Sequence, residues 1–181
     1  MKTHILDHLG KRRMNFEIYN PIVDYLNQNV CYFKIYDLMG NICNLMRYNS
    51  EGCKKRINSE DGKYYFISGN KKNENIFGLE TLNLKPNILF ICEGIFDSCS
   101  FSFLGYPSIA MNTKLSCISK NTQRQIDLIS IGRKVIYCPD IDDSNFKKEG
   151  KIIILPEEGK KDIGDSDIDY IKNKIKKYEK K

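Results

Sequence analysis

The sequence lacks the usual signs of a zinc site, a disulfide framework or a membrane span. Its seven cysteines are odd in number and include no CxxC pair. It has only two histidines, His4 and His8, and two ligands do not complete a zinc site. We therefore expect both on the solvated face of a helix. No signal peptide is visible, and no apolar run approaches the ~20 residues that a transmembrane helix needs.

These absences favour a cytoplasmic globular protein with no membrane partner. Several cysteines lie in apolar runs, such as Cys92 in ILFICEG and Cys138 in KVIYCPD, so we expect buried, reduced thiols. Hydrophobic residues make up 41% of the 181-residue chain, which argues against disorder. This length suits one domain, or one domain with a small lobe. The formal net charge of +6 is compatible with a partner that carries phosphate.

Residues 1–84 are predicted to form an N-terminal α+β lobe. Ile5 and Leu9 mark a first helix, and PIVDYL at 21–26 is typical of a second. CYFKIYDL and ICNLMRY predict a hairpin, because Gly40 supplies the positive φ that a tight turn requires. KKRIN and KYYFISG are further strand candidates, and residues 70–75 are expected to form a loop.

Residues 85–181 alternate predicted strands with predicted helices. Short apolar runs predict strands at 87–94, 107–111, 134–140 and 151–157. Helices are expected over IFDSCSFSFLG, over 116–131, and from Ser166, where S-D-I-D has the pattern of a capping box. This order is typical of an α/β fold in which helices flank a parallel sheet.

Acidic residues follow two of these strands. Glu93 and Asp97 come after the first, and Asp140 and Asp142 end the third. Working residues gather at the carboxyl ends of strands in an open parallel sheet, and residues two apart on an extended segment point to the same side. Carboxylate oxygens suit Mg²⁺ or Mn²⁺. Each acid alone is more often a solvated turn residue or helix cap, so the joint pattern carries the hypothesis.

The segments ILFICEGIFDSCSF, GYPSIAMNTKLS and RKVIYCPDIDDSN resemble the TOPRIM domain of bacterial and phage DnaG-type DNA primases. The shared pattern is an apolar strand, EG and a following Asp, a small-residue strand, and an apolar strand that ends in DxD. KKDIGD at 160–165 resembles the third acidic element of that family. YDLMGNICNLMRY and the stretch from KYYFISG to IFGLE resemble its upstream lobe. The resemblance covers roughly residues 30–170.

The resemblance implies a TOPRIM-type sheet over 85–181 beside the N-terminal lobe, which would line a nucleic-acid track. It implies catalytic roles for Glu93, Asp140 and Asp142, with Glu93 as a metal ligand or proton-transfer group. The implied metal ligands are Glu93, Asp97, Asp140, Asp142 and Asp162, and Asp165 is a further match to the third acidic element.

Basic residues beside aromatic ones predict where phosphates and bases would bind. Residues matched to that track, or able to hold a nucleotide, are Arg47, Lys54, Lys55, Arg56, Lys63 and Lys114. The alternative is a solvated surface, because lysines also protect exposed sheet edges.

Four features depart from the family pattern. Asn112 stands where a glycine is usual before Thr113. The segment DSNFKKEG after Asp142 leaves room for at most about two helical turns, and the sequence contains neither a zinc ribbon nor a helicase segment.

The resemblance therefore implies a reduced primase core, of phage or mobile-element type, that makes RNA primers with Mg²⁺ or Mn²⁺. Its expected partners are a single-stranded DNA template and nucleoside triphosphates, with a replicative helicase or a separate zinc-binding protein as further candidates. A metal-dependent TOPRIM nuclease and an inactive nucleic-acid-binding module are the alternatives.

Overall fold

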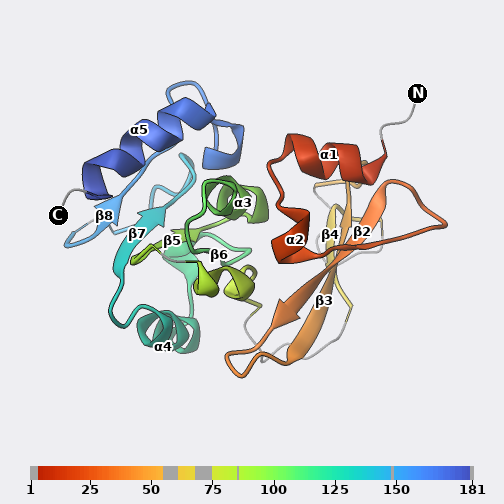
Figure 1. Cartoon of the computed structure of the whole chain (residues 1–181), viewed down its shortest axis with the longest axis horizontal. Helices are drawn as coiled ribbons and strands as arrows, with labels where there is room; N and C mark the ends of the chain where they lie inside the picture. The colour runs from red at the N-terminus through yellow and green to blue at the C-terminus, as the bar shows by residue number, and fades with distance from the viewer. Residues whose placement is uncertain (1–3, 55–60, 68–74, 85, 148, 180–181) are drawn as a thin grey trace.

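A computed structural model of the chain shows two four-stranded sheets side by side (Figure 1). It describes residues 4–54, 61–67, 75–84, 86–147 and 149–179. The first sheet and helices α1 and α2 form the red and orange half of Figure 1, and the second sheet with α3, α4 and α5 forms the green and blue half. Residue 84, where the sequence predicts a boundary between two domains, lies between η1 and β5. The existence of two separate domains stays a prediction.

The first sheet is antiparallel, with strand order β1-β2-β3-β4. The predicted hairpin is confirmed, and Gly40 in its turn has a φ of 84°. The elements of this half are α1 (Ile5–Lys11), α2 (Phe16–Tyr19), β1 (Ile22–Val23), β2 (Val30–Tyr36), β3 (Ile42–Asn49) and β4 (Tyr64–Phe66).

The predicted helix at 21–26 is wrong. Asn20 ends α2 in the left-handed conformation, and Ile22 and Val23 pair with β2. The Asp24 side chain accepts hydrogen bonds from the amides of Leu26 and Asn27, which holds a turn where the helix was expected. Most of the KKRIN segment and residues 70–74 lie outside the described residues.

The second sheet is entirely parallel, with strand order β6-β5-β7-β8. This confirms the predicted α/β class, since helices alternate with the strands. Its elements are η1 (Leu79–Asn83), β5 (Ile88–Cys92), α3 (Ile95–Phe103), β6 (Ser108–Ala110), η2 (Leu115–Cys117), α4 (Lys120–Ile129), β7 (Lys134–Cys138), β8 (Ile152–Ile153), η3 (Ile163–Asp165) and α5 (Ile168–Glu179).

Alternation along β5 places helices on both faces of this sheet. Ile88, Phe90 and Cys92 belong to a core cluster with residues of α3 and α5. Leu89 and Ile91 belong to another cluster with residues of η1 and α4. Each face therefore buries every second side chain of β5, as the two-residue period of a strand requires.

Helix α3 also connects the two halves. Ile95, Phe96 and Cys99 belong to the same buried cluster as the core residues of α1, β2 and β3. The amide and carbonyl of Phe77 pair with those of Ala110 at the edge of β6. In Figure 1, α3 lies between the second sheet and α1 and α2. The first sheet therefore shares a buried cluster with α3 and with Ala110 of β6.

Two predicted helix starts are wrong. Helix α4 begins at Lys120 rather than at 116, because the Ser119 hydroxyl caps it and residues 115–117 form the 3₁₀ turn η2. Ser166 does not cap α5. Its hydroxyl donates to the carbonyl of Asp162 and accepts from the amide of Glu157, while the Asp167 carboxylate accepts the amide of Asp169.

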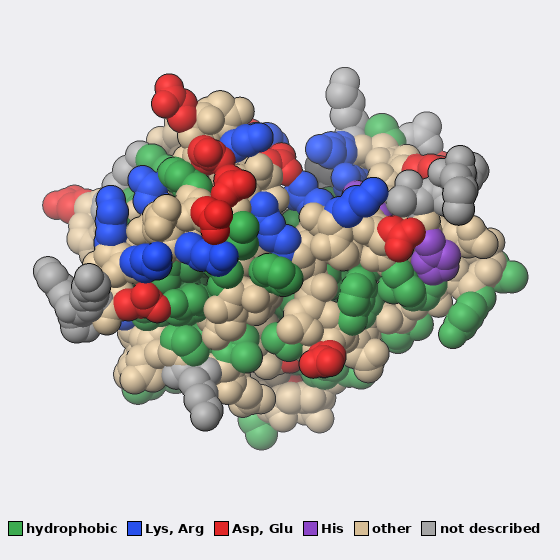
Figure 2. Space-filling model, turned by 45° about the horizontal axis from the view of Figure 1, so that its top comes forward, with side chains coloured by type: hydrophobic (Ala, Val, Ile, Leu, Met, Phe, Trp, Pro, Cys, Tyr) green, Lys and Arg blue, Asp and Glu red, His purple; other side chains and the backbone are tan. Residues whose placement is uncertain are grey.

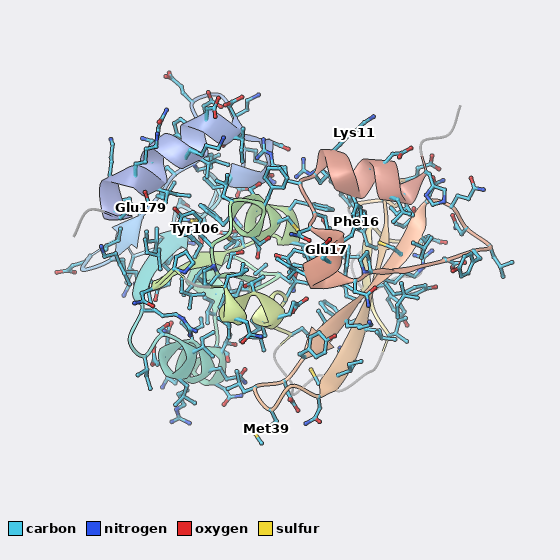
Figure 3. The ribbon with its side chains drawn as sticks, viewed as in Figure 1. Lys11, Phe16, Glu17, Met39, Tyr106 and Glu179 are labelled. Carbon is cyan, nitrogen blue, oxygen red and sulfur yellow. The ribbon has the colours of Figure 1, made fainter. Side chains whose placement is uncertain are left out.

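The far end of α5 is held by a contact with the second sheet's connecting segment. Tyr106 donates a hydrogen bond to Glu179, and both residues are labelled in Figure 3.

Both histidines are partly exposed, but each also makes a structural contact. The ring of His8 is hydrogen-bonded to the Tyr48 hydroxyl at 2.8 Å, and His4 caps α1. All seven cysteines are free thiols, but Cys53 and Cys117 are exposed, so the prediction of burial fails for those two. Among the described residues, no helix has the length and apolar character needed to cross a bilayer.

Candidate active site

The predicted acidic residues meet where the strand order of the second sheet reverses. The chain runs from β5 outward to β6 and then returns across β5 to β7. Glu93 directly follows β5, and Asp140 lies two residues beyond the end of β7. Such a reversal opens a crevice at the carboxyl ends of the strands.

Glu93 is nearly buried and directly bridges neighbouring segments. Its Oε1 accepts hydrogen bonds from the amides of Asp140, at 3.2 Å, and Leu115, at 3.4 Å. Burial, the nearby charge of Asp140 and a hydrogen bond with Asp143 raise the pKa of Glu93 to about 8. The carboxylate is therefore held in place by the backbone but lacks a compensating positive charge.

Asp97 is more deeply placed, with 3% of its surface exposed. Its Oδ2 accepts the amide of Gly94 at 3.0 Å, and its Oδ1 accepts the amide of Gly164 at 2.7 Å. Burial and the charge of Asp162 raise its pKa. Asp97 thus ties the turn after β5 to the 3₁₀ turn η3.

Asp140 and Asp142 share the crevice with Glu93. Burial and the charge of Asp162 raise the pKa of Asp140 to about 6. Asp142 is more exposed and lies 3.7 Å from the Lys114 ammonium and 3.9 Å from that of Lys161. Lys114 also donates to the carbonyl of Asp142 at 2.8 Å.

Asp143 has a supporting role in the loop after β7. It accepts hydrogen bonds from the amide and hydroxyl of Ser116. Burial opposes its ionisation, but the bonds from Ser116 outweigh burial, so its pKa is lowered. This contact fixes the loop that carries Asp142 against η2.

The third acidic element is anchored from the opposite end of the chain. Asp162 caps η3 by accepting the amide of Asp165 at 2.9 Å. Asp165 forms an ion pair with Arg12, and Arg13 donates to the carbonyl of Ser166 at 2.6 Å. The segment after α1 therefore positions this element.

A pocket of about 410 Å³ joins the acidic strand ends to the first sheet. Lys63 lies 5.6 Å above the Tyr48 ring, and burial together with the charges of Lys54 and Arg12 lowers its pKa. Figure 2 shows lysine and arginine side chains gathered on both halves of the molecule. The pocket is lined by Met46, Lys54, Lys63, Tyr64, Phe66, Glu93, Gly94, Ile95, Asn112, Thr113, Lys114, Asp140, Asp142 and Lys161.

The predicted basic residues separate into three groups. Lys54, Lys63 and Lys114 line the pocket. Arg47 does not, because alternation on β3 turns it away from Met46, which does line the pocket. Arg47 instead lies close enough to Asp24 and Tyr32 for its positive charge to act on both side chains. Lys55 and Arg56 lie outside the described residues.

Asn112 explains one departure from the family pattern. It has a φ of 55°, a left-handed conformation that glycine adopts freely and asparagine tolerates better than most residues. Its amide donates to the carbonyl of Glu93 at 2.9 Å, and its side chain donates to the carbonyl of Asn75. Asparagine therefore reproduces the backbone that a glycine would give.

The segment after Asp142 contains no helix among its described residues, so the expected shortening is confirmed.

The acids fit a divalent metal by their chemistry. Three carboxylates line one pocket, and oxygen ligands suit Mg²⁺ or Mn²⁺. Burial and neighbouring carboxylates raise the pKa values of Glu93 and Asp140, and a bound cation would favour the ionised form of both. As the side chains stand, no group of three or more His, Cys, Asp or Glu among the described residues is arranged to hold an ion.

Sequence reasoning missed two contributors to the site. Lys161 lines the pocket and lies near Asp142. The sequence pattern pointed to its neighbour Asp162 as a metal ligand but not to Lys161. Arg12 reaches Asp165 from α1. A pair of arginines after a short helix carries no sequence signal that it meets an acid near the other end of the chain.

Comparisons with known proteins give structural matches only. No protein-family model and no curated protein matches the sequence. Among solved structures, a DnaG primase catalytic domain bound to ssDNA has a TM-score of 0.55 and 16% identity, covering 96% of this chain and 64% of that one.

Two other primase structures agree with this match. The primase fragment of the bacteriophage T7 primase-helicase has a TM-score of 0.56 and 15% identity, covering 90% and 68% of the two chains. The RNA polymerase domain of Mycobacterium tuberculosis DnaG, in complex with double-stranded DNA, has a TM-score of 0.59 and 13% identity, covering 95% and 63%. The chain thus spans just under two thirds of the first of these relatives and has the TOPRIM-containing fold of DnaG-type primase cores.

Proposed function

We propose that this chain, which has the fold of DnaG-type primase catalytic cores, is a template-directed nucleotidyltransferase that makes RNA primers on single-stranded DNA. The observation that carries the proposal is the composition of the pocket. Its acids Glu93, Asp140 and Asp142 share one space with four lysines from both halves of the chain. Carboxylates for metal and lysines for phosphate are what nucleotidyl transfer requires.

Mg²⁺ or Mn²⁺ is the proposed cofactor, with Glu93, Asp140 and Asp142 as its main ligands. When bound, the ions would neutralise the negative charge that develops on the transferring phosphate. Asp162 and Asp97 are further predicted ligands. Both oxygens of Asp97 already accept backbone amides, which favours a positioning role for that residue.

The chain's own groups supply position, charge and a base. The 3′-oxygen of the primer forms a bond to the α-phosphorus, the bond to the bridging oxygen breaks, and pyrophosphate leaves. Lys63, Lys114 and Lys161 would hold the triphosphate. The hydroxyl proton passes to the ionised carboxylate of Glu93, which lines the same pocket.

The template would cross the pocket beside Tyr64 and Phe66, which line it next to Lys54. Aromatic rings stack on bases while lysines contact phosphates. A replicative helicase and a separate zinc-binding protein are proposed as partners. A cytoplasmic location and a phage or mobile-element origin also stay predictions.

The test is primer synthesis from labelled ribonucleotides on single-stranded DNA with Mg²⁺ or Mn²⁺. We expect products with the wild type, a loss of at least 100-fold with Glu93→Gln or Asp140→Asn, and full activity with the exposed control Glu149→Gln. Full activity in both site variants would show that the assigned site is wrong.

Parallel assays distinguish the alternatives. Strand cleavage that depends on Glu93, without primer synthesis, would identify a TOPRIM nuclease. Retained DNA binding without either reaction would identify an inactive binding module.

A further inference from the structure

A second hollow of about 520 Å³ lies between the turn of the β2–β3 hairpin, η1 and α4. It shares no lining residue with the acidic pocket. In Figure 1 the hairpin turn and α4 lie at the lower edge of the molecule. Its lining residues are Tyr36, Asp37, Leu38, Gly40, Leu79, Glu80, Leu82, Asn83, Leu128 and Ile129.

Glu80 lines this hollow and has, among the described residues, one carboxylate oxygen without a partner just beneath its surface. Its Oε2 is buried and has no hydrogen-bond partner within the described parts of the chain. Burial raises the pKa of Glu80 to about 7, and the charge of Lys34 offsets only part of this effect. Native proteins leave few buried polar atoms without partners, so this oxygen indicates a group that the isolated chain does not supply.

The surroundings of Glu80 are apolar and open. Leu38 is 42% exposed and Leu128 is 60% exposed, and they lie on opposite sides of the hollow in the hairpin turn and α4. Met39, at the hairpin tip, is 85% exposed and points away from the molecule in Figure 3. Apolar side chains gathered at a hollow are typical of interaction sites.

We propose that this hollow binds a polypeptide segment of a partner protein, which inserts a lysine or arginine side chain toward Glu80. Such side chains combine an aliphatic stem with a charged end. The stem would pack against Leu79 and Leu128, while the charged end would donate to the free Glu80 oxygen. Asp37 at the rim adds negative charge, which disfavours a nucleic acid as the occupant.

The proposal is independent of primer synthesis, because Glu80 lies outside the acidic pocket. Its test uses the isotope-labelled full chain and two acetylated amphipathic peptides. One peptide has a central arginine between leucines, and the other replaces that arginine with citrulline, its neutral isostere. Binding is followed by backbone amide shifts.

We expect the arginine peptide to shift the amides of residues 79–83 and 128–129, and to bind at least tenfold more tightly than the citrulline peptide. Glu80→Gln should remove this preference, and Leu128→Ser should weaken both peptides. Glu149→Gln should change neither. Primer synthesis should be unchanged in all three variants.

Equal affinity for the two peptides, shifts elsewhere, or no binding would overturn the proposal. Leu128 is on an exposed helix face, so its substitution tests the site even if the Glu80 variant folds poorly. A dimer in sedimentation that Glu80→Gln dissociates would identify a second copy as the occupant and overturn the assignment to a different protein.

Discussion

Arg12 forms an ion pair with Asp165, which lies 153 positions further along the chain. The same guanidinium lies over the ring of Phe96, 4.8 Å from its centroid. These contacts join the segment after α1, the start of α3 and the third acidic element. The geometry of the site therefore depends on a residue outside the TOPRIM sheet.

Replacing Arg12 with alanine should lower both stability and activity. The pair is partly exposed, with side chains 27% and 45% accessible, so its loss costs at most about 1 kcal/mol. Loss of the contact with Phe96 adds about 0.5–1 kcal/mol. Urea unfolding measures the change, and primer synthesis should fall several-fold. Arg124→Ala, on the exposed face of α4, should change neither stability nor activity. If the two variants have equal effects, the ion pair between Arg12 and Asp165 does not hold the site in place.

Gly94→Ala and Gly10→Ala form a matched pair. A Cβ at Gly94 would lie 2.8 Å from the Asp97 Oδ2, whereas one at Gly10 meets nothing within 4 Å. We expect Gly94→Ala to displace Asp97, cost about 1–3 kcal/mol and reduce primer synthesis more than tenfold. Gly10→Ala should stabilise α1 by about 0.5–1 kcal/mol. Thermal unfolding and activity assays measure both, and an active Gly94→Ala variant would refute a role for this close contact.

Asn112→Gly should retain full activity, because glycine adopts a φ of 55° without strain. Asn112→Val should lose about 1–2 kcal/mol, because a β-branched side chain tolerates the left-handed region much less well than asparagine does. Chemical denaturation and primer synthesis of the two variants check this. Similar stability for both would show that backbone conformation does not select the residue.

Without metal, the wild type should become less stable as pH rises from about 4.5 to about 8. Glu93 has its pKa raised from 4.5 to about 8, so the folded state holds its proton more tightly than the unfolded state does. Its contribution is complete below the lower value and is lost as pH rises through the higher one. Urea unfolding across this range measures the slope.

Glu93→Gln should reduce that slope but not abolish it, because Asp97, Asp140 and Glu80 also have raised pKa values. Added Mg²⁺ should restore wild-type stability at pH 8. A slope that is the same in both proteins would rule out Glu93 as its source.

Lys54→Ala should weaken binding to single-stranded DNA, whereas Arg47→Ala should not. Lys54 lines the pocket on the proposed path of the template, and Arg47 lies on the face of β3 that is turned away from the pocket. One lost phosphate contact should lower the salt dependence of binding by about one counterion. Fluorescence anisotropy over a series of salt concentrations measures both quantities. If Arg47→Ala has the larger effect, the template follows the other face of the sheet.

The strands and the acidic ends of the second sheet were predictable because their signals are local. A short apolar run such as ILFIC at β5 predicts a buried strand, and Glu93 directly after it marks the carboxyl end. Parallel topology then follows from the order of elements, so the meeting of Glu93 and Asp140 was predictable as well.

The N-terminal half was less predictable because long-range contacts decide its structure. PIVDYL suits a helix by its apolar spacing, but pairing of Ile22 with Tyr32 makes it a strand. Alternation could not show which face of β3 meets the pocket, so Arg47 and Lys63 were grouped together. Arg12 and the open hollow beside Glu80 depend on tertiary packing alone.

The buried cluster that joins the two halves has a consequence for synthesis on the ribosome. Ile5 and Leu9 at one end and Ala110 at the other belong to the same buried cluster. The N-terminal half therefore cannot complete its core until the chain has been translated through β6. During that interval its apolar residues are exposed, so nascent chains stalled before β6 are expected to need chaperones more than the finished protein does.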